Sequence, residues 1–298
     1  SIWLSFVPDE ESSGGGMASL LDSKLYKEQW KGRIALALDE GLASETDVFS
    51  VFYGERLPWW VDVTATGNTG HGSRFIDETA VEQLLALTQK ALEFRKGQRA
   101  ILHGENRHTE ENCSHAVVAK KKKTLGDVTT LNITTLQAGV QVADTYAYNV
   151  VPPVAKCSLD IRISPHVHPS EISTMLDTWC QECSASSTSN KVTWKYLMDN
   201  GLQEHATTST DVRINPWYGV FQTALTEKLN VQMEPQVFPA ATDSRFLRAL
   251  GIRALGFSPM RNCPILLHEN DEYIPIPTFL EGIHVYIGLL EALGSHKE

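Results

Sequence analysis

The feature that most constrains the fold is a change in the order of secondary-structure patterns along the chain. Up to about residue 60, short apolar strand patterns alternate with helical spacing, as in a sheet covered by helices. From Trp60 the pattern changes to two-residue alternation, followed by an amphipathic helix, two alternating strands, a second helix and a closing strand. The first pattern returns near residue 200 and ends in an apolar helix. We therefore predict one α/β domain that is interrupted by a self-contained α+β unit.

The inserted unit has the predicted order β-α-β-β-α-β, which is typical of a ferredoxin-like fold. We place it at residues 60–198, between two parts of the α/β domain at 1–59 and 199–298. Residues 1–7 are expected to form a buried strand, and a later strand is expected to break at Pro58. Clefts between two such domains commonly hold small-molecule sites.

Local signals within the insert give further expectations. The polar stretch 95–127 is expected to form a long surface loop. The helix that follows the central strands is expected to begin with Ser170 as its N-cap. Cys180 and Cys183 form a CxxC that is expected to lie on this helix, because no second cysteine pair or nearby histidine completes a zinc or redox site.

Composition argues against several classes of partner. The 298 residues carry 26 basic and 36 acidic side chains, a formal net charge of −10, so binding to nucleic acid or an anionic membrane is not expected. No apolar run reaches the roughly 20 residues needed to span a bilayer. Five cysteines in so long a chain favour reduced thiols and a cytoplasmic location.

Acids and one histidine stand at the ends of three predicted strands: Asp9–Glu11, Asp39–Glu40 and His268. Loops at the carboxyl ends of strands are where α/β sheets gather functional groups. Carboxylates and an imidazole are ligands for Zn²⁺ and other divalent ions. Neighbouring acids of the DEE segment could share one site if Gly14–Gly16 permit a tight turn. A solvated turn or a helix N-terminus would explain the same acids without a metal.

Other motifs give weaker signals. In "GFSPM", Pro259 disrupts the GxSxG pattern of a nucleophile elbow around Ser258. The segment "GNTGHG" lacks the strand-to-helix context of a dinucleotide fingerprint. His166 and His168 form an HxH that is expected to be exposed and not to bind metal.

Seven segments occur in one order along the chain: "FVPDEE", "LDEG", "GHGSRF", "AYNVVP", "PAATDSRF", "ALGFSP" and "LLHENDE". In this order they resemble the aminoacylase branch of the dinuclear-zinc amidohydrolase and peptidase family, which includes acetylornithine deacetylase and carboxypeptidase G. The resemblance covers nearly the whole chain. It implies a zinc-peptidase-like α/β catalytic domain, an inserted domain that forms a homodimer, and two zinc ions in each complete active site. The implied reaction is hydrolysis of N-acyl-L-amino acids.

The resemblance also implies roles for individual residues. Glu10 corresponds to the general base, and Glu11 corresponds to a zinc ligand. Glu40 corresponds to a ligand of one zinc ion, and His268 to a ligand of the other. His71 in "GHGSRF" corresponds to the histidine of the inserted domain that reaches the active site of the partner subunit.

Two further residues correspond to positions that contact the substrate, Asn149 in "AYNVVP" and Arg245 in "ATDSRF". Glu10 would accept a proton from zinc-bound water and deliver it to the leaving amine. His71 and Asn149 could stabilise the oxyanion, and Arg245 could bind the α-carboxylate through two parallel hydrogen bonds. Without the resemblance, His71, Asn149 and Arg245 are typical turn or surface residues.

The chain departs from the family at three places. The family has an HxD segment and a bridging aspartate upstream of DEE, and both would precede Ser1. We therefore expect the chain to begin after them and to lack strands that would cover apolar edges. The segment between Gly139 and Asn149 is longer than in aminoacylases, and 95–127 diverges.

Two functions stay open on the sequence alone. The first is a homodimeric, cytoplasmic N-acyl-L-amino-acid amidohydrolase, with a dinuclear-zinc peptidase or an acetylornithine-type deacetylase as the alternative enzymes. The second is a catalytically inactive relative that dimerises or regulates. The preferred acyl group and amino-acid side chain are left open.

Overall fold

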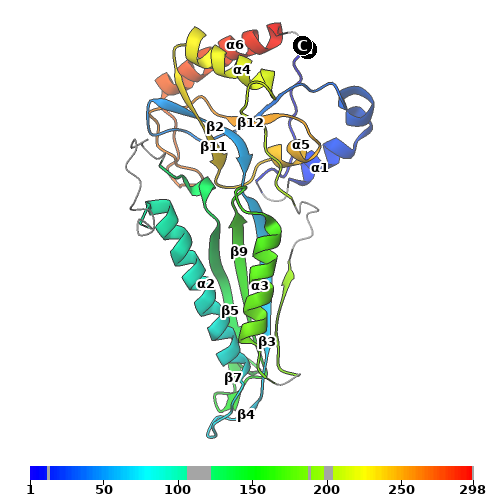
Figure 1. Ribbon diagram of the computed structural model, residues 1–298, viewed down its shortest axis with the longest axis vertical. Helices are drawn as coiled ribbons and strands as arrows, with labels where there is room; N and C mark the ends of the chain where they lie inside the picture. Colours follow the sequence, from blue (N-terminus) through cyan, green and yellow to red (C-terminus); the bar gives the residue numbers. More distant parts are fainter. Residues whose placement is uncertain (12–13, 106–121, 187–188, 198–203, 297–298) are drawn as a thin grey trace, which may run out of the picture. The chain divides into compact units, whose positions relative to one another are not determined.

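The computed structural model describes residues 1–11, 14–105, 122–186, 189–197 and 204–296 (Figure 1). The chain forms two compact units, one made of residues 1–55 and 206–298 and the other of residues 56–205. These ends lie a few residues from the boundaries expected from the sequence. The assignment of the second unit to dimerisation stays a prediction.

The first unit contains a four-stranded mixed sheet with the strand order β1-β12-β2-β11. β1 runs parallel to β12 and β2 runs parallel to β11, whereas β12 and β2 are antiparallel. Its elements are α1 (Gly15–Asp22), the π-helical turn η1 (Tyr26–Trp30), β1 (Ala37–Asp39), β2 (Val48–Glu55), α4 (Pro216–Thr223), the π-helical turn η3 (Ala224–Lys228), β11 (Gln232–Phe238), α5 (Ser244–Ala249), β12 (Ala254–Phe257) and α6 (Ile276–Ser295).

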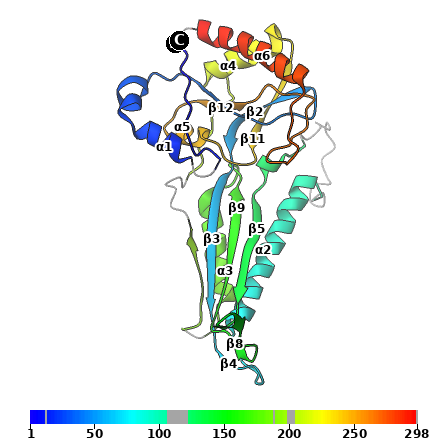
Figure 2. The same cartoon turned by 180° about the vertical axis from the view of Figure 1, so that it is seen from behind.

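Alternation along β12 shows that helices cover both faces of this sheet. Leu255 and Phe257 lie in a core with residues of α4, η3 and α6, whereas Ala254 packs with Met17 of α1 and Leu247 of α5. Figures 1 and 2 show α4 and α6 together, apart from α1 and α5. All four residues of β12 are buried, as expected for a strand covered on both faces.

Helix α6 is long and apolar enough to span a membrane by length and composition, with a mean hydropathy of 1.3. No apolar run of this length was expected from the sequence. In the structure, Val285, Leu289 and Leu293 of this helix lie in the core of the first unit, and the Tyr286 hydroxyl donates to the Phe257 carbonyl at 2.6 Å. This packing is that of a helix that covers a sheet.

The second unit contains an antiparallel sheet with the strand order β10-β3-β9-β5. The elements have the predicted order β-α-β-β-α-β, with the short strand pairs β4–β8 and β6–β7 added. They are β3 (Leu57–Thr66), β4 (Gly70–His71), α2 (Ala80–His103), the 3₁₀ turn η2 (Leu125–Asp127), β5 (Thr130–Ala138), β6 (Gln141–Val142), β7 (Thr145–Tyr146), β8 (Val150–Val151), β9 (Val154–Ile163), α3 (Pro169–Cys183) and β10 (Val192–Tyr196).

Both helices of the second unit cover the same face of its sheet (Figures 1 and 2). Alternate residues of β3, such as Val61 and Val63, form one core with Leu84 of α2 and Leu176 of α3. This arrangement follows from the two-residue period of a strand, which turns every second side chain to the same face.

Two predictions in the first part of the chain were wrong. Residues 1–7 form no strand, and Leu4 and Phe6 are 77% and 92% exposed, because no strand of the described chain pairs with this segment. The expected strand break lies at Arg56, whereas Pro58 lies inside β3. Among the described residues, Pro58 pairs with β9 alone, since pairing with β10 begins at Val61. An open strand edge tolerates a residue without an N–H.

Two predictions in the second unit also need correction. Residues 95–103 continue α2, which ends at Gly104 with φ 69°, while residues 106–121 of the expected loop lie outside the described chain. The N-cap of α3 is His168 and not Ser170, because the His168 side chain accepts from the Ser170 N–H. Cys180 and Cys183 lie on α3, as predicted, and both are buried.

Candidate functional site

The acidic loop begins with Asp9, which has a left-handed backbone with φ 69°. Its carbonyl accepts from the Gly14 N–H at 2.8 Å, and its Oδ2 accepts from the Gly15 N–H at 3.3 Å. Asp9 therefore closes the loop on itself at the start of α1. Glu10 is half-buried within the loop and Glu11 is exposed.

Two of the predicted metal ligands, Glu11 and His268, meet although they are far apart in the sequence. Glu11 Oε2 and His268 Nε2 lie 3.5 Å apart, and both side chains are about three-quarters exposed (78% and 76%). His268 has φ 60°, a left-handed conformation that is uncommon outside glycine. The turn after β12 therefore presents this imidazole to the acidic loop.

Glu40, the third predicted ligand, lies beside Glu10 at the end of β1. The residue as a whole is exposed, but burial of its carboxyl group, followed by the hydrogen bond and charge of Asp39 and a hydrogen bond with Glu10, raises the pKa of Glu40 to about 9. Crowded carboxyls of this kind favour a shared proton, and a divalent cation would favour the charged forms instead.

The predicted ligands fit the chemistry of a divalent metal at two places, Glu11 with His268 and Glu40 beside Glu10. Carboxylate oxygens and an imidazole nitrogen are accepted ligands of zinc. Within the part of the chain that the structure describes, no three His, Cys, Asp or Glu side chains gather around one point. The described residues thus supply a partial ligand set.

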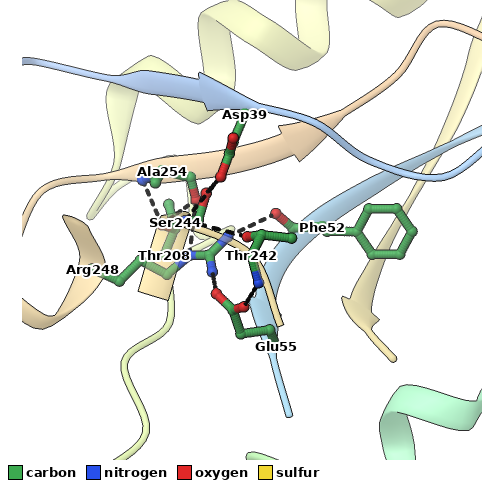
Figure 3. Close-up of polar contacts among 8 residues, drawn as sticks. All are labelled: Asp39, Phe52, Glu55, Thr208, Thr242, Ser244, Arg248 and Ala254. Atoms are coloured by element: carbon green, nitrogen blue, oxygen red, sulfur yellow. Dashed lines mark hydrogen bonds and ion pairs between the residues drawn. The ribbon is translucent and has the colours of Figure 1, made fainter. Parts of the chain in front are cut away.

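A hydrogen-bond network joins the end of β1 to the segment that carries Arg245 (Figure 3). Asp39 Oδ2 accepts from the Ser244 N–H at 2.8 Å and from the Ser244 hydroxyl at 2.7 Å. Because Asp39 precedes Glu40 and Ser244 precedes Arg245, these two bonds fix a predicted metal ligand relative to the predicted substrate-binding arginine.

A buried ion pair holds the other side of the same segment (Figure 3). Glu55 accepts from Arg248 Nη1 at 2.6 Å and from the Thr242 N–H, and Arg248 also donates to the carbonyls of Phe52 and Ala254. Burial raises the pKa of Glu55 from 4.5 to about 7, although the charge of Arg248 opposes this rise. Burial likewise lowers the pKa of Arg248.

Asp243 lies between these contacts and is 3% exposed. Its Oδ1 has no hydrogen-bond partner in the described chain. Burial, followed by the negative charges of Asp39 and Glu10, raises the pKa of Asp243 to about 6, and the charge of Arg245 opposes this rise. The Arg245 guanidinium stacks on the neighbouring Phe246 ring, 4.7 Å from its centroid.

The two predicted oxyanion-stabilising residues meet in the second unit. β4 pairs with β8, and His71 Nε2 lies 3.4 Å from the Asn149 amide nitrogen. The Ser73 N–H donates to His71 Nδ1 at 3.2 Å, and the Ser73 hydroxyl lies 2.8 Å from the same nitrogen. Both side chains are exposed, so they can donate to an external group.

Sequence reasoning missed three residues that organise the site: Asp243 and the ion pair of Glu55 and Arg248. Asp9 and Asp39 stood among the acids noted at strand ends, but no individual role was predicted for either. The others depend on contacts between distant segments, which local patterns do not contain.

The comparisons with known proteins agree with these motifs. A family model described as peptidase family M20/M25/M40 matches residues 1–292. The chain is 42% identical to aminoacylase-1 of Mus musculus over 296 residues. The matched region covers 99% of this chain and 64% of that protein. It is 40% identical to aminoacylase-1 of Dictyostelium discoideum, with 98% and 66% covered. The chain therefore spans about two thirds of the length of these curated relatives.

Solved structures show the same fold at low sequence identity. The aminopeptidase PepT from Bacillus cereus has a TM-score of 0.60 and 14% identity, with 97% of this chain and 63% of that chain covered. The di-peptidase Dug1p from Saccharomyces cerevisiae has a TM-score of 0.58 and 14% identity, with 97% and 65% covered. Since the family model matches nearly the whole length, the chain belongs to the peptidase family M20/M25/M40.

Proposed function

We propose that this chain contributes catalytic and metal-binding residues to a hydrolase that converts N-acyl-L-amino acids into a carboxylate and a free L-amino acid. The relatives with 40% and 42% identity are aminoacylases. The observation that carries the proposal is the convergence of the acidic loop with two distant segments, Glu11 with His268 and Glu10 with Glu40.

In this proposal the metal is zinc, with two ions in each complete site. Glu11 and His268 would hold one ion, and Glu40 would help to hold the other. Bound zinc supplies Lewis acidity, which polarises a carbonyl group and lowers the pKa of water. The raised pKa of Glu40 supports this assignment, because a bound cation would offset the cost of keeping this carboxyl charged beside Asp39 and Glu10.

Glu10 is the proposed general base. It is half-buried and lies within hydrogen-bond reach of Glu40, so it stands beside a proposed metal ligand without the open exposure of Glu11. It would take a proton from the attacking water and pass it to the leaving nitrogen. Proton transfer of this kind contributes about 10²–10⁴-fold to a rate.

Arg245 and the pair of His71 and Asn149 complete the proposed chemistry. The Arg245 guanidinium would bind the α-carboxylate of the substrate through two parallel hydrogen bonds. His71 Nε2–H and the Asn149 amide would donate to the oxyanion that forms at the acyl carbon. We propose that these two residues come from the second copy in a homodimer, and that the enzyme acts in the cytoplasm.

A substrate panel tests this function. The zinc-loaded protein is given N-acetyl-L-methionine, N-acetyl-D-methionine, N²-acetyl-L-ornithine and a neutral dipeptide, and release of free amine is measured. We expect N-acetyl-L-methionine to be the better substrate and its D-isomer to be inert. Preference for the dipeptide or the ornithine derivative would replace the proposal with a peptidase or a deacetylase. No turnover at full zinc loading would support an inactive relative.

A further inference from the structure

Three side chains converge on the backbone of Gly14, at the start of α1. A Cβ atom on Gly14 would lie 2.5 Å from Phe246 Cε2, 2.9 Å from Arg245 Nη2 and 3.0 Å from Asp243 Oδ1. Gly14 is buried and has φ 70°, so both its backbone and its surroundings require glycine. The space that a side chain would fill is occupied by the Arg245 guanidinium and its neighbours.

Arg245 is therefore held between two surfaces. Its guanidinium stacks on the Phe246 ring on one side, 4.7 Å from the centroid. On another side, the guanidinium extends into the space beside Gly14, where a Cβ atom would lie 2.9 Å from Arg245 Nη2. A stacked and enclosed guanidinium has a fixed plane, and a fixed plane is what two-point binding of a carboxylate requires.

Gly14 also belongs to the loop that carries the proposed catalytic acid. The Gly14 N–H donates to the Asp9 carbonyl at 2.8 Å, and the Gly15 N–H donates to Asp9 Oδ2 at 3.3 Å. This loop continues through Glu10 and Glu11. The same short piece of backbone therefore positions both the Arg245 guanidinium and the proposed general base, Glu10.

The buried carboxylate of Asp243 adds an electrostatic reason for the position of Arg245. Asp243 is 3% exposed, and its Oδ1 has no hydrogen-bond partner in the described chain. The charge of Arg245 acts on this carboxylate. A guanidinium displaced from this place would leave the carboxylate buried with less compensating charge, which is unfavourable.

We propose that Gly14 and Phe246 are the positioning residues of Arg245, and that they set where the α-carboxylate of an N-acyl-L-amino acid lies relative to Glu10. This inference rests on the proposed function. On this inference, Gly14 of the acidic loop controls how well the protein binds the α-carboxylate of the substrate. Neither Gly14 nor Phe246 has to touch the substrate.

The test is Gly14→Ala in the protein shown to hydrolyse N-acetyl-L-methionine. We expect KM for this substrate to rise about tenfold or more, the cost of one hydrogen bond to a charged group, while kcat falls less. The inhibition constant of N-acetyl-L-methioninamide, which lacks the carboxylate, should change no more than in the control. An equal loss for the acid and the amide, or a loss in kcat alone, would overturn the inference.

The matched control is Gly32→Ala. Gly32 has φ 73°, and a Cβ there would meet no atom within 4 Å. Both variants therefore carry the same backbone penalty, but only Gly14→Ala disturbs Arg245. Thermal unfolding of both variants separates loss of the fold from loss of recognition.

A second variant keeps the inference testable if Gly14→Ala does not fold. Phe246→Leu removes the stacking ring without adding an atom, and it should raise KM for the acid while leaving inhibition by the amide unchanged. An unchanged KM for the acid in folded Phe246→Leu would contradict the inference. If Arg245→Ala itself leaves KM unchanged, the proposed role of Arg245 fails. If Arg245→Ala raises KM but Gly14→Ala behaves like Gly32→Ala, only the positioning inference fails.

Discussion

At the scale of single residues, Glu55 and Arg248 form a buried ion pair next to the proposed site. Their side chains are 6% and 2% exposed. Burial disfavours the charged form of each partner, and their attraction opposes this effect only in part. Such a pair is weak evidence for stability as a whole, but losing one partner leaves an uncompensated buried charge. Its evident contribution is to hold the segment that carries Asp243 and Arg245.

We expect Arg248→Met to lower the free energy of unfolding by about 3–5 kcal/mol, because Glu55 then stays buried without its partner. The double variant Glu55→Gln/Arg248→Met should recover much of this loss. Arg213→Met is the control, since Arg213 is 86% exposed in its pair with Asp211 and its loss should cost no more than about 1 kcal/mol. Urea unfolding measures all three, and equal losses for Arg248→Met and Arg213→Met would contradict this account.

The raised pKa of Glu55 also predicts a dependence of stability on pH. The native pKa of about 7 lies above the ordinary value of 4.5, so the folded protein binds this proton more tightly than the unfolded chain. The contribution of Glu55 to stability is therefore greatest below pH 4.5 and falls as the pH rises to 7, by about 3 kcal/mol. The unfolding free energy of the wild-type protein minus that of Glu55→Gln/Arg248→Met should decline over this range. A difference that is flat or rises with pH would refute the assignment.

At the scale of elements, the start of α2 combines local sequence with tertiary packing. The Thr79 hydroxyl accepts from the Glu82 N–H at 3.2 Å, and the Glu82 carboxylate accepts from the Thr79 N–H at 3.0 Å. This capping box lies directly before the buried residues Ala80 and Leu84. It therefore fixes where the helix begins relative to the sheet.

We expect Thr79→Ala to destabilise the protein by about 1 kcal/mol, the usual cost of a lost N-cap. Thr178→Ala in α3 is the control, because Thr178 is exposed and its hydroxyl donates to the Thr174 carbonyl within its own helix. Differential scanning calorimetry should show a lower Tm for Thr79→Ala than for Thr178→Ala. The reverse order would show that the capping box does not stabilise α2.

The elements that were predicted from sequence are those whose signal is local. The helical periods of α2, α3 and α6 and the alternation of β3 and β9 are contained in the segments themselves. Residues 1–7 carry an apolar pattern suited to a strand, but a strand also needs a partner, and the described chain gives it none. Propensity describes a segment, whereas pairing is a property of two segments.

The site shows the same limit. The residue types of Glu11, Glu40 and His268 suggested a metal, and their roles came from the motif resemblance. The left-handed backbones of Asp9 and His268 could not be predicted, since these conformations are imposed by the turns that bring the two segments together. The contact of Asp39 with Ser244 joins residues on β1 and α5 and leaves no trace in either local pattern.

At the scale of the whole molecule, the proposed site needs residues from both units of the chain, and we propose that a homodimer brings them together. Glu10 lies in the first unit, whereas His71 and Asn149 lie exposed on the second. If His71 acts in the site of its partner subunit, two different inactive subunits can complement each other. This property distinguishes a shared site from one completed within a single chain.

We therefore expect mixtures of His71→Ala and Glu10→Gln subunits to regain activity that neither variant has alone. In a heterodimer, one of the two sites would combine an intact Glu10 with an intact His71. Activity is measured after subunit exchange, with heterodimers separated by different affinity tags. Purified heterodimers without activity would rule out the shared site, while leaving the chemistry of Glu10 untested.

The most direct test of the central claim is the Glu10→Gln variant, measured for both turnover and metal content. Glutamine keeps the shape of the side chain but cannot accept the proton of the attacking water, so kcat for N-acetyl-L-methionine should fall by about 10²–10⁴-fold. Zinc content should stay at the wild-type value, because Glu11, Glu40 and His268 are unchanged. A Glu10→Gln protein that keeps its zinc and its full activity would contradict the assignment of Glu10 as the general base.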